Sequence, residues 1–99
     1  MIHVVAIITA SAGKREELLN EFKAVVPLVH KEKGCIEYQP VTDTSEPGSQ
    51  AKLGPDTYMV IEKWESMDDL RAHAASEHMA AYGKRVADLV VDRAVYVLN

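Results

Sequence analysis

Residues able to act on an aromatic molecule gather in one stretch of the chain, Tyr58–Tyr82. The stretch contains the only tryptophan, Trp64, and two of the four histidines, His73 and His78. An imidazole can serve as a general base toward a weakly acidic phenol. We therefore take Trp64, His73 and His78 as candidate catalytic residues. The alternative is a strand and helix that carry ordinary amphipathic side chains.

The two histidines are expected at opposite kinds of helix end. His73 lies near the end of one predicted helix, and His78 lies in the first turn of the next. A helix C-terminus favours the protonated imidazole and an N-terminus disfavours it, so the two residues can differ in charge near neutral pH. The alternative is a pair of partly exposed helix-end histidines. Their spacing across a helix break matches no zinc-binding pattern, and no metal site is predicted.

Three further side chains are candidate substrate contacts. Glu62 and Trp64 point to the same face of a predicted strand, because side chains alternate along it. Tyr82 follows His78 by four residues and shares its helical face. Tyr38 lies on another strand and could face the same cavity, although core packing also explains it. Trp64 could likewise be core filler, but its indole N–H needs a polar partner, which favours a polar pocket.

Hydrophobic periodicity predicts four strands and three helical pieces. The strands are expected at Ile2–Ala10, Cys35–Asp43, Thr57–Glu65 and Val91–Leu98. The first helix is expected over Lys14–Lys33, with a kink or a short second segment at Pro27. Ser66 and Ser76 are expected to cap the other two helical pieces. Thr44–Asp56 is polar and rich in Gly and Pro, which is typical of a long loop that covers a pocket, reaches a partner or forms a mobile hairpin tip.

This order of elements is the split βαβ pattern of a ferredoxin-like α+β fold. Right-handed crossovers then give an antiparallel sheet in the strand order 4-1-3-2, with the helices on one face. Pro40 and the pair Asp92-Arg93 mark the two edge strands. The first and third strands are apolar on both faces, so the face without helices should be covered. We expect a homodimer that forms through this open face.

Bulk properties narrow the function classes. The 99 residues indicate a single domain, residues 1–99. The net charge of −4 disfavours nucleic acid as a partner. The longest apolar run, Val4–Ile8, is too short to span a membrane. A lone cysteine, Cys35, and the lack of a signal-peptide pattern favour the cytoplasm.

Several short motifs together resemble one family along nearly the whole chain. They are Ala12-Gly13-Lys14, Glu32-Lys33-Gly34-Cys35 before Tyr38, and Glu62-Lys63-Trp64-Glu65-Ser66 before Leu70, His73 and His78. This pattern resembles the antibiotic biosynthesis monooxygenase family, especially its small quinol-monooxygenase-like members. The resemblance implies a dimeric α+β barrel that oxidises a small phenolic aromatic or quinol with O₂, using no metal, haem, flavin or other cofactor.

The resemblance also suggests roles for the candidate residues. Trp64 would line the pocket, His73 or His78 would be the base or hydrogen-bond partner, and Tyr82 and Glu62 would support them. Haem-degrading members of the family use an Asn on the first strand, which Ile2–Ala10 lacks. Two alternatives stay open: an isomerase or signal-molecule processing enzyme on the same scaffold, and a non-enzymatic binder of small aromatic ligands.

Overall fold

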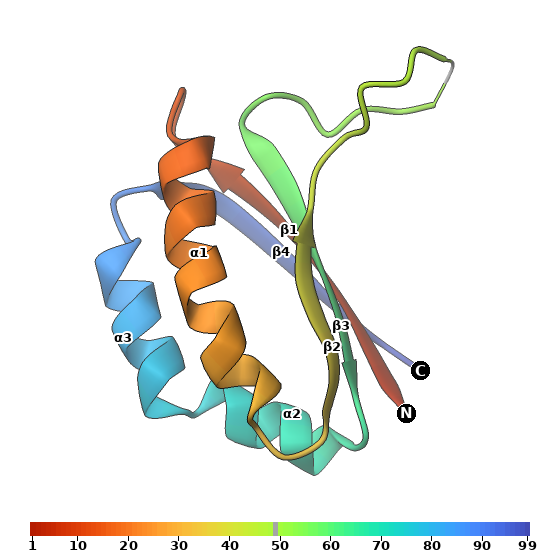
Figure 1. Ribbon diagram of the computed structural model, residues 1–99, viewed down its shortest axis with the longest axis vertical. Helices are drawn as coiled ribbons and strands as arrows, with labels where there is room; N and C mark the ends of the chain where they lie inside the picture. Colours follow the sequence, from red (N-terminus) through yellow and green to blue (C-terminus); the bar gives the residue numbers. More distant parts are fainter. Residues whose placement is uncertain (49) are drawn as a thin grey trace.

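The computed structural model describes residues 1–48 and 50–99; residue 49, in the expected loop Thr44–Asp56, lies outside the described residues. Figure 1 shows the seven elements in the predicted order. The strands are β1 (Ile2–Ala10), β2 (Cys35–Val41), β3 (Thr57–Trp64) and β4 (Val90–Leu98). The helices are α1 (Arg15–His30), α2 (Met67–Ala74) and α3 (Glu77–Arg85).

The four strands form one antiparallel sheet in the order β2-β3-β1-β4. This confirms the predicted order 4-1-3-2 and the ferredoxin-like α+β architecture. The apolar strands β1 and β3 are central, and Val5 pairs with Ile61 between them. Pro40 lies on the edge strand β2. Its missing N–H therefore removes no hydrogen bond from the interior of the sheet.

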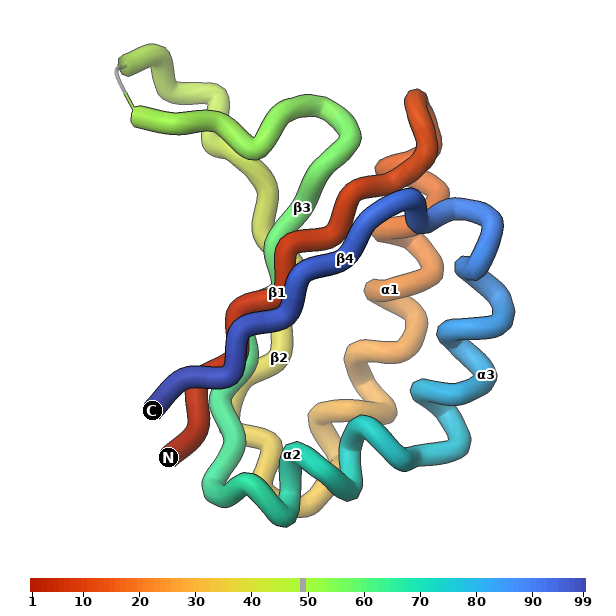
Figure 2. The backbone as a smooth tube through the Cα atoms, turned by 180° about the vertical axis from the view of Figure 1, so that it is seen from behind, coloured from red at the N-terminus to blue at the C-terminus, as the bar shows by residue number. Residues whose placement is uncertain are grey.

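All three helices cover the same face of the sheet, as two opposite views show (Figures 1 and 2). Alternate residues of β1 and β3 are buried beneath them, with Trp64 fully buried at the end of β3. The predicted helical stripe supplies the other half of this core, namely Leu18, Phe22, Val25 and Val29. This packing positions the helix-facing side chains of β3 against α2.

Helix α1 runs without interruption through Pro27, so the expected second segment does not form. The proline removes one hydrogen bond to the carbonyl of Lys23. Both residues are exposed, so water can satisfy that carbonyl. The buried stripe on the other side of the helix stays continuous, which explains why the helix tolerates the proline. The helix is nevertheless shorter at both ends than the expected Lys14–Lys33.

The break between α2 and α3 falls at the predicted place. Ser66 caps α2 by accepting the backbone N–H of Asp69 at 3.1 Å, and its hydroxyl donates to the Asp69 carboxylate at 3.0 Å. Ser76 precedes α3 but donates to the carbonyl of His73 at 2.7 Å instead of capping with its side chain. This bond ties the start of α3 to the end of α2.

Strand β2 ends at Val41, two residues before its expected end at Asp43. The Asp43 carboxylate accepts the backbone N–H groups of Leu53 and Gly54, each at 2.9 Å. These bonds close the base of the loop, whose described residues extend past the end of the sheet (Figure 1). The expected strand ends at Glu65 and Val91 are each displaced by one residue.

The second face of the sheet carries no helix (Figures 1 and 2). The strand register places apolar residues from all four strands on this open face: Val5, Ile7, Val41, Met59, Ile61, Ala94, Tyr96 and Leu98. Tyr96 and Leu98 are each about half exposed, at 51% and 49%. Within the described part of the chain, no helix is long and apolar enough to cross a membrane.

Candidate active site

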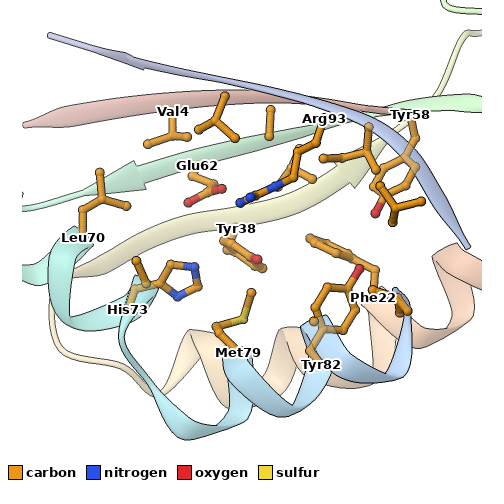
Figure 3. Close-up of a pocket in the computed structure, with 18 of the residues that line it drawn as sticks. Val4, Phe22, Tyr38, Tyr58, Glu62, Leu70, His73, Met79, Tyr82 and Arg93 are labelled. Atoms are coloured by element: carbon orange, nitrogen blue, oxygen red, sulfur yellow. The ribbon is translucent and has the colours of Figure 1, made fainter. Parts of the chain in front are cut away.

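A cavity of about 640 Å³ lies between the helix-facing side of the sheet and helices α2 and α3 (Figure 3). Most of its lining is aliphatic or aromatic, which suits a small aromatic ligand. A few polar side chains interrupt this lining. They are Tyr38, Tyr58, Glu62, His73, Tyr82 and Arg93.

Glu62 brings a buried carboxyl group to the cavity wall. It is 7% exposed, and one of its oxygens accepts the indole N–H of Trp64 at 2.9 Å. Burial raises the pKa of Glu62, while the Trp64 hydrogen bond and the nearby charges of His73 and Arg93 act in the opposite direction. A buried carboxyl with a raised pKa is suited to take a proton from a ligand.

His73 lies between two aromatic side chains beside Glu62. Its ring centroid is 4.8 Å from that of Trp64 and 5.2 Å from that of Tyr38. Its Nδ1 lies 3.0 Å from a carboxylate oxygen of Glu32. An ionised carboxylate only accepts hydrogen bonds, so Nδ1 carries the proton and donates it. The other nitrogen, Nε2, is therefore the one left to act on a ligand in the cavity.

His78 meets the same carboxylate from α3. Its Nε2 lies 2.7 Å from Glu32 Oε2, the oxygen that also accepts from His73. Glu32 follows α1 in the chain, so this one side chain joins the end of α1 to both α2 and α3. It is 14% exposed, which makes the pairing stronger than one on the surface.

An aromatic cluster lines the cavity from Tyr38, which lies beside His73, to Phe22, Tyr58 and Tyr82 (Figure 3). Phe22 stacks on Tyr38 with ring centroids 5.3 Å apart, and it meets Tyr58 and Tyr82 edge-on at 5.8 and 6.0 Å. Burial raises the pKa of all three tyrosines. Their hydroxyl groups therefore stay protonated at neutral pH, where they can donate hydrogen bonds to a ligand.

The structure brings together most of the residues that the sequence singled out. His73, Glu62, Tyr38 and Tyr82 line the cavity. Within the described residues, Trp64 and His78 do not line it, although Trp64 was expected to. Trp64 instead packs behind Glu62 and His73 with no exposed surface, and it supports both of them.

Sequence reasoning missed four residues of this region: Glu32, Tyr58, Met79 and Arg93. Tyr58 shares the strand face of Glu62, and Met79 belongs to a predicted helical stripe, so alternation and periodicity could have found both. Glu32 lies just beyond a helix, where neither pattern applies. Arg93 was used only to identify an edge strand.

The described part of the chain contains no group of three His, Cys, Asp or Glu side chains arranged to hold a metal ion. The carboxylate of Glu32 is instead occupied by two imidazoles. The polar side chains that line the cavity can form hydrogen bonds with a ligand.

Comparisons with known proteins match the chain along its length. A family model described as antibiotic biosynthesis monooxygenase matches residues 1–85. The probable quinol monooxygenase YgiN of Escherichia coli K12 is 36% identical over 101 residues, which cover 100% of this chain and 97% of that protein. Protein PA3566 of Pseudomonas aeruginosa superposes with a TM-score of 0.81 at 25% identity, covering 98% of this chain and 90% of that one. Rv0793 of Mycobacterium tuberculosis superposes with a TM-score of 0.81 at 22% identity, covering 99% of this chain and 92% of that one.

Proposed function

The chain belongs to the antibiotic biosynthesis monooxygenase family of oxidoreductases, and on that premise we propose that it oxidises a small quinol or phenol with O₂ in this cavity. The observation that carries the proposal is that Glu62 and His73 both lie on the wall of one largely apolar cavity. The proposal extends to a reaction that needs no metal, haem or flavin, because a quinol anion can itself supply the electrons.

In the proposed reaction, His73 Nε2 or the free oxygen of Glu62 removes a proton from a hydroxyl group of the quinol. The apolar lining then excludes water from the anion, which strengthens it as an electron donor to O₂. One oxygen atom replaces a ring hydrogen as a hydroxyl group, and the other leaves as water. The quinol supplies all four electrons and becomes a hydroxyquinone, so atoms and electrons balance.

The other polar side chains have supporting roles in this proposal. Trp64 holds Glu62 through its indole N–H, and Glu32 holds the His73 ring with Nδ1 protonated. The Tyr38 and Tyr82 hydroxyl groups can donate hydrogen bonds to the second oxygen of the quinol. His78 acts on the cavity through Glu32, since it contacts that carboxylate rather than the cavity itself.

The proposal includes a homodimer formed through the open face of the sheet. The apolar residues on that face come from all four strands, and a surface of this kind is typical of an interface. Sheet-on-sheet packing would bury it in a symmetric pair of copies. The cavity lies on the opposite face, so each copy would keep its own site.

Oxygen uptake with a panel of hydroquinones tests the proposal. We expect His73→Ala and Glu62→Gln each to lower kcat/KM by about 100-fold or more, the contribution typical of a positioned acid or base. His78→Ala removes the other imidazole that contacts Glu32. It should lower kcat/KM by less, because His78 does not line the cavity. Wild-type rates in His73→Ala and Glu62→Gln would contradict the proposal.

Anaerobic experiments separate the alternatives. Conversion of an aromatic or lactone substrate without O₂ would indicate an isomerase or a related enzyme that needs only a base. Saturable binding of aromatic ligands, with no turnover in air, would indicate a binding protein. Either result would replace the monooxygenase reaction proposed for this cavity.

A further inference from the structure

Arg93 brings a positive charge into the cavity from the edge strand β4. Its Cα pairs with that of Ile8 in the neighbouring strand, so its side chain lies on the helix-facing side with Val95 and Val97. Figure 3 shows the side chain reaching into the cavity, with the guanidinium group pointing toward Glu62 and lying above Tyr38. Among the described residues that line the cavity, Arg93 is the only lysine or arginine.

No carboxylate of the described residues lies beside the guanidinium group. The ion pairs of the described residues all lie elsewhere, so no described carboxylate oxygen comes within 4.0 Å of it. Glu62 is the acid nearest to it along the cavity wall, and one Glu62 oxygen already accepts from Trp64. Arg93 nevertheless faces the polar groups of the cavity (Figure 3), and its charge therefore acts to lower the pKa of Glu62, Tyr38 and Tyr82.

Arg93 is exposed at the edge of the sheet while the cavity is empty, and a ligand that fills the cavity would remove part of the water around this cation. An arginine that loses its water without gaining an anion is costly. Glu62 is a poor substitute partner, because one of its oxygens already accepts from Trp64 and leaves a single oxygen for the guanidinium group. A carboxylate on the ligand can instead accept two parallel hydrogen bonds from the guanidinium group.

We propose that the cavity binds a phenol or quinol whose ring also carries a carboxylate, and that Arg93 binds this carboxylate. The ligand's hydroxyl group then faces Glu62 and His73, the two groups able to deprotonate it. Arg93 thus determines specificity: it selects aromatic acids over neutral phenols of the same size. This inference rests on the proposed function for the choice of a hydroxylated ring, but binding measurements test it separately.

Calorimetric titration with matched phenols tests the carboxylate site. The probes are 4-hydroxybenzoate and 4-methylphenol, which share a ring and a hydroxyl group and differ in the carboxylate. We expect the wild-type protein to bind the acid more tightly. Arg93→Met, which keeps an unbranched stem but removes the guanidinium group and its charge, should weaken binding of the acid by about 10- to 100-fold and leave 4-methylphenol within about twofold.

Two further variants complete the experiment. Arg93→Lys keeps the charge but cannot form the bidentate hydrogen bonds. Its affinity for 4-hydroxybenzoate should lie between those of the wild type and Arg93→Met. Arg71→Met is the matched control, because Arg71 pairs with Asp68 on the surface of α2, away from the cavity. It should bind both probes as the wild type does. Equal losses for both probes in Arg93→Met, or no loss for the acid, would overturn the proposal.

Turnover distinguishes this proposal from the proposed reaction. We expect 2,5-dihydroxybenzoate to be oxidised with a higher kcat/KM than 2-methylhydroquinone, and Arg93→Met to reverse or abolish this preference. Turnover of both quinols with no preference would overturn the carboxylate site and leave the monooxygenase reaction standing. Arg93-dependent binding of 4-hydroxybenzoate with no turnover of any quinol would support the carboxylate site and contradict the reaction.

Discussion

His73 donates a hydrogen bond from Nδ1 to the Glu32 carboxylate at 3.0 Å, although 41 residues separate them in the sequence. The bond joins α2 to the segment that follows α1, and it fixes which ring nitrogen carries the proton. The same carboxylate oxygen lies 2.7 Å from His78 in α3. Glu32 therefore orients the candidate base and holds together the helices that cover the cavity.

Loss of the Glu32 carboxylate should destabilise the protein. We expect Glu32→Gln to lower the free energy of unfolding by about 1–3 kcal/mol, because the neutral amide oxygen accepts weaker hydrogen bonds from the two imidazoles than the charged carboxylate does. Glu21→Gln is the matched control: Glu21 pairs with Arg85 on the surface, where both side chains are more than 40% exposed. It should cost less than about 1 kcal/mol. Urea unfolding measures both values, and equal losses would contradict the role given to Glu32.

Glu62 should make stability depend on pH. Burial raises its native pKa above the ordinary value of 4.5, so the folded protein binds this proton more tightly than the unfolded chain does. Its contribution to stability is therefore fully present below pH 4.5 and is lost as the pH rises through the native pKa. Each tenfold difference in proton affinity corresponds to about 1.4 kcal/mol.

The variant Glu62→Gln, which stays neutral throughout, isolates this effect. The free energy of unfolding of Glu62→Gln minus that of the wild type should increase as the pH rises from 4 to 8. Thermal unfolding across that range gives the difference at each pH. A difference that does not change with pH would show that the Glu62 carboxyl binds its proton equally tightly in the folded and unfolded protein.

Gly34 should tolerate no side chain. It has a φ of +80°, and a Cβ atom there would lie 2.1 Å from the Asp69 carboxylate, which is hydrogen-bonded to the cap of α2. We expect Gly34→Ala to cost more than about 2 kcal/mol, from the left-handed backbone and the clash together. Gly13→Ala separates the two effects, because Gly13 has a φ of +75° but open space around it. Denaturant midpoints that fall equally in both variants would contradict the clash.

The sequence predicted the fold well because local patterns specify most of it. Strand alternation placed Glu62 and Trp64 on the same face of β3, and Pro40 identified an edge strand from its missing N–H alone. The short second segment expected as one possibility at Pro27 does not form, because the proline lies on the exposed side, where the buried stripe of α1 is unaffected. Propensity alone does not report which side of a helix faces the core.

The candidate site was less predictable because its key contacts join distant elements. Periodicity placed His73 and Glu62 on suitable faces, but it could not indicate that Glu32 reaches both histidines. The direction of the Arg93 side chain follows from its register with Ile8, which depends on how two strands far apart in the sequence align. Register of this kind is a tertiary property.

A charged side chain introduced on the open face should weaken the proposed dimer. Ile61 lies on this face in the middle of β3, and twofold symmetry would place two copies of any substitution in one interface. We expect Ile61→Lys to raise the dimer dissociation constant by about 100-fold or more. Leu28→Lys, the same kind of change at an exposed position on α1, should leave it unchanged. Sedimentation that finds the wild-type protein monomeric at micromolar concentration would contradict the dimer.

The stoichiometry of oxygen consumption tests the central claim most directly. Chelator-treated protein is mixed with a known amount of a hydroquinone in an oxygen electrode, and catalase is added once uptake stops. Monooxygenation consumes one O₂ per quinol and forms water and a hydroxyquinone, so we predict that catalase releases no oxygen. Release of half of the consumed oxygen would show that O₂ leaves as hydrogen peroxide, and it would contradict the proposed reaction.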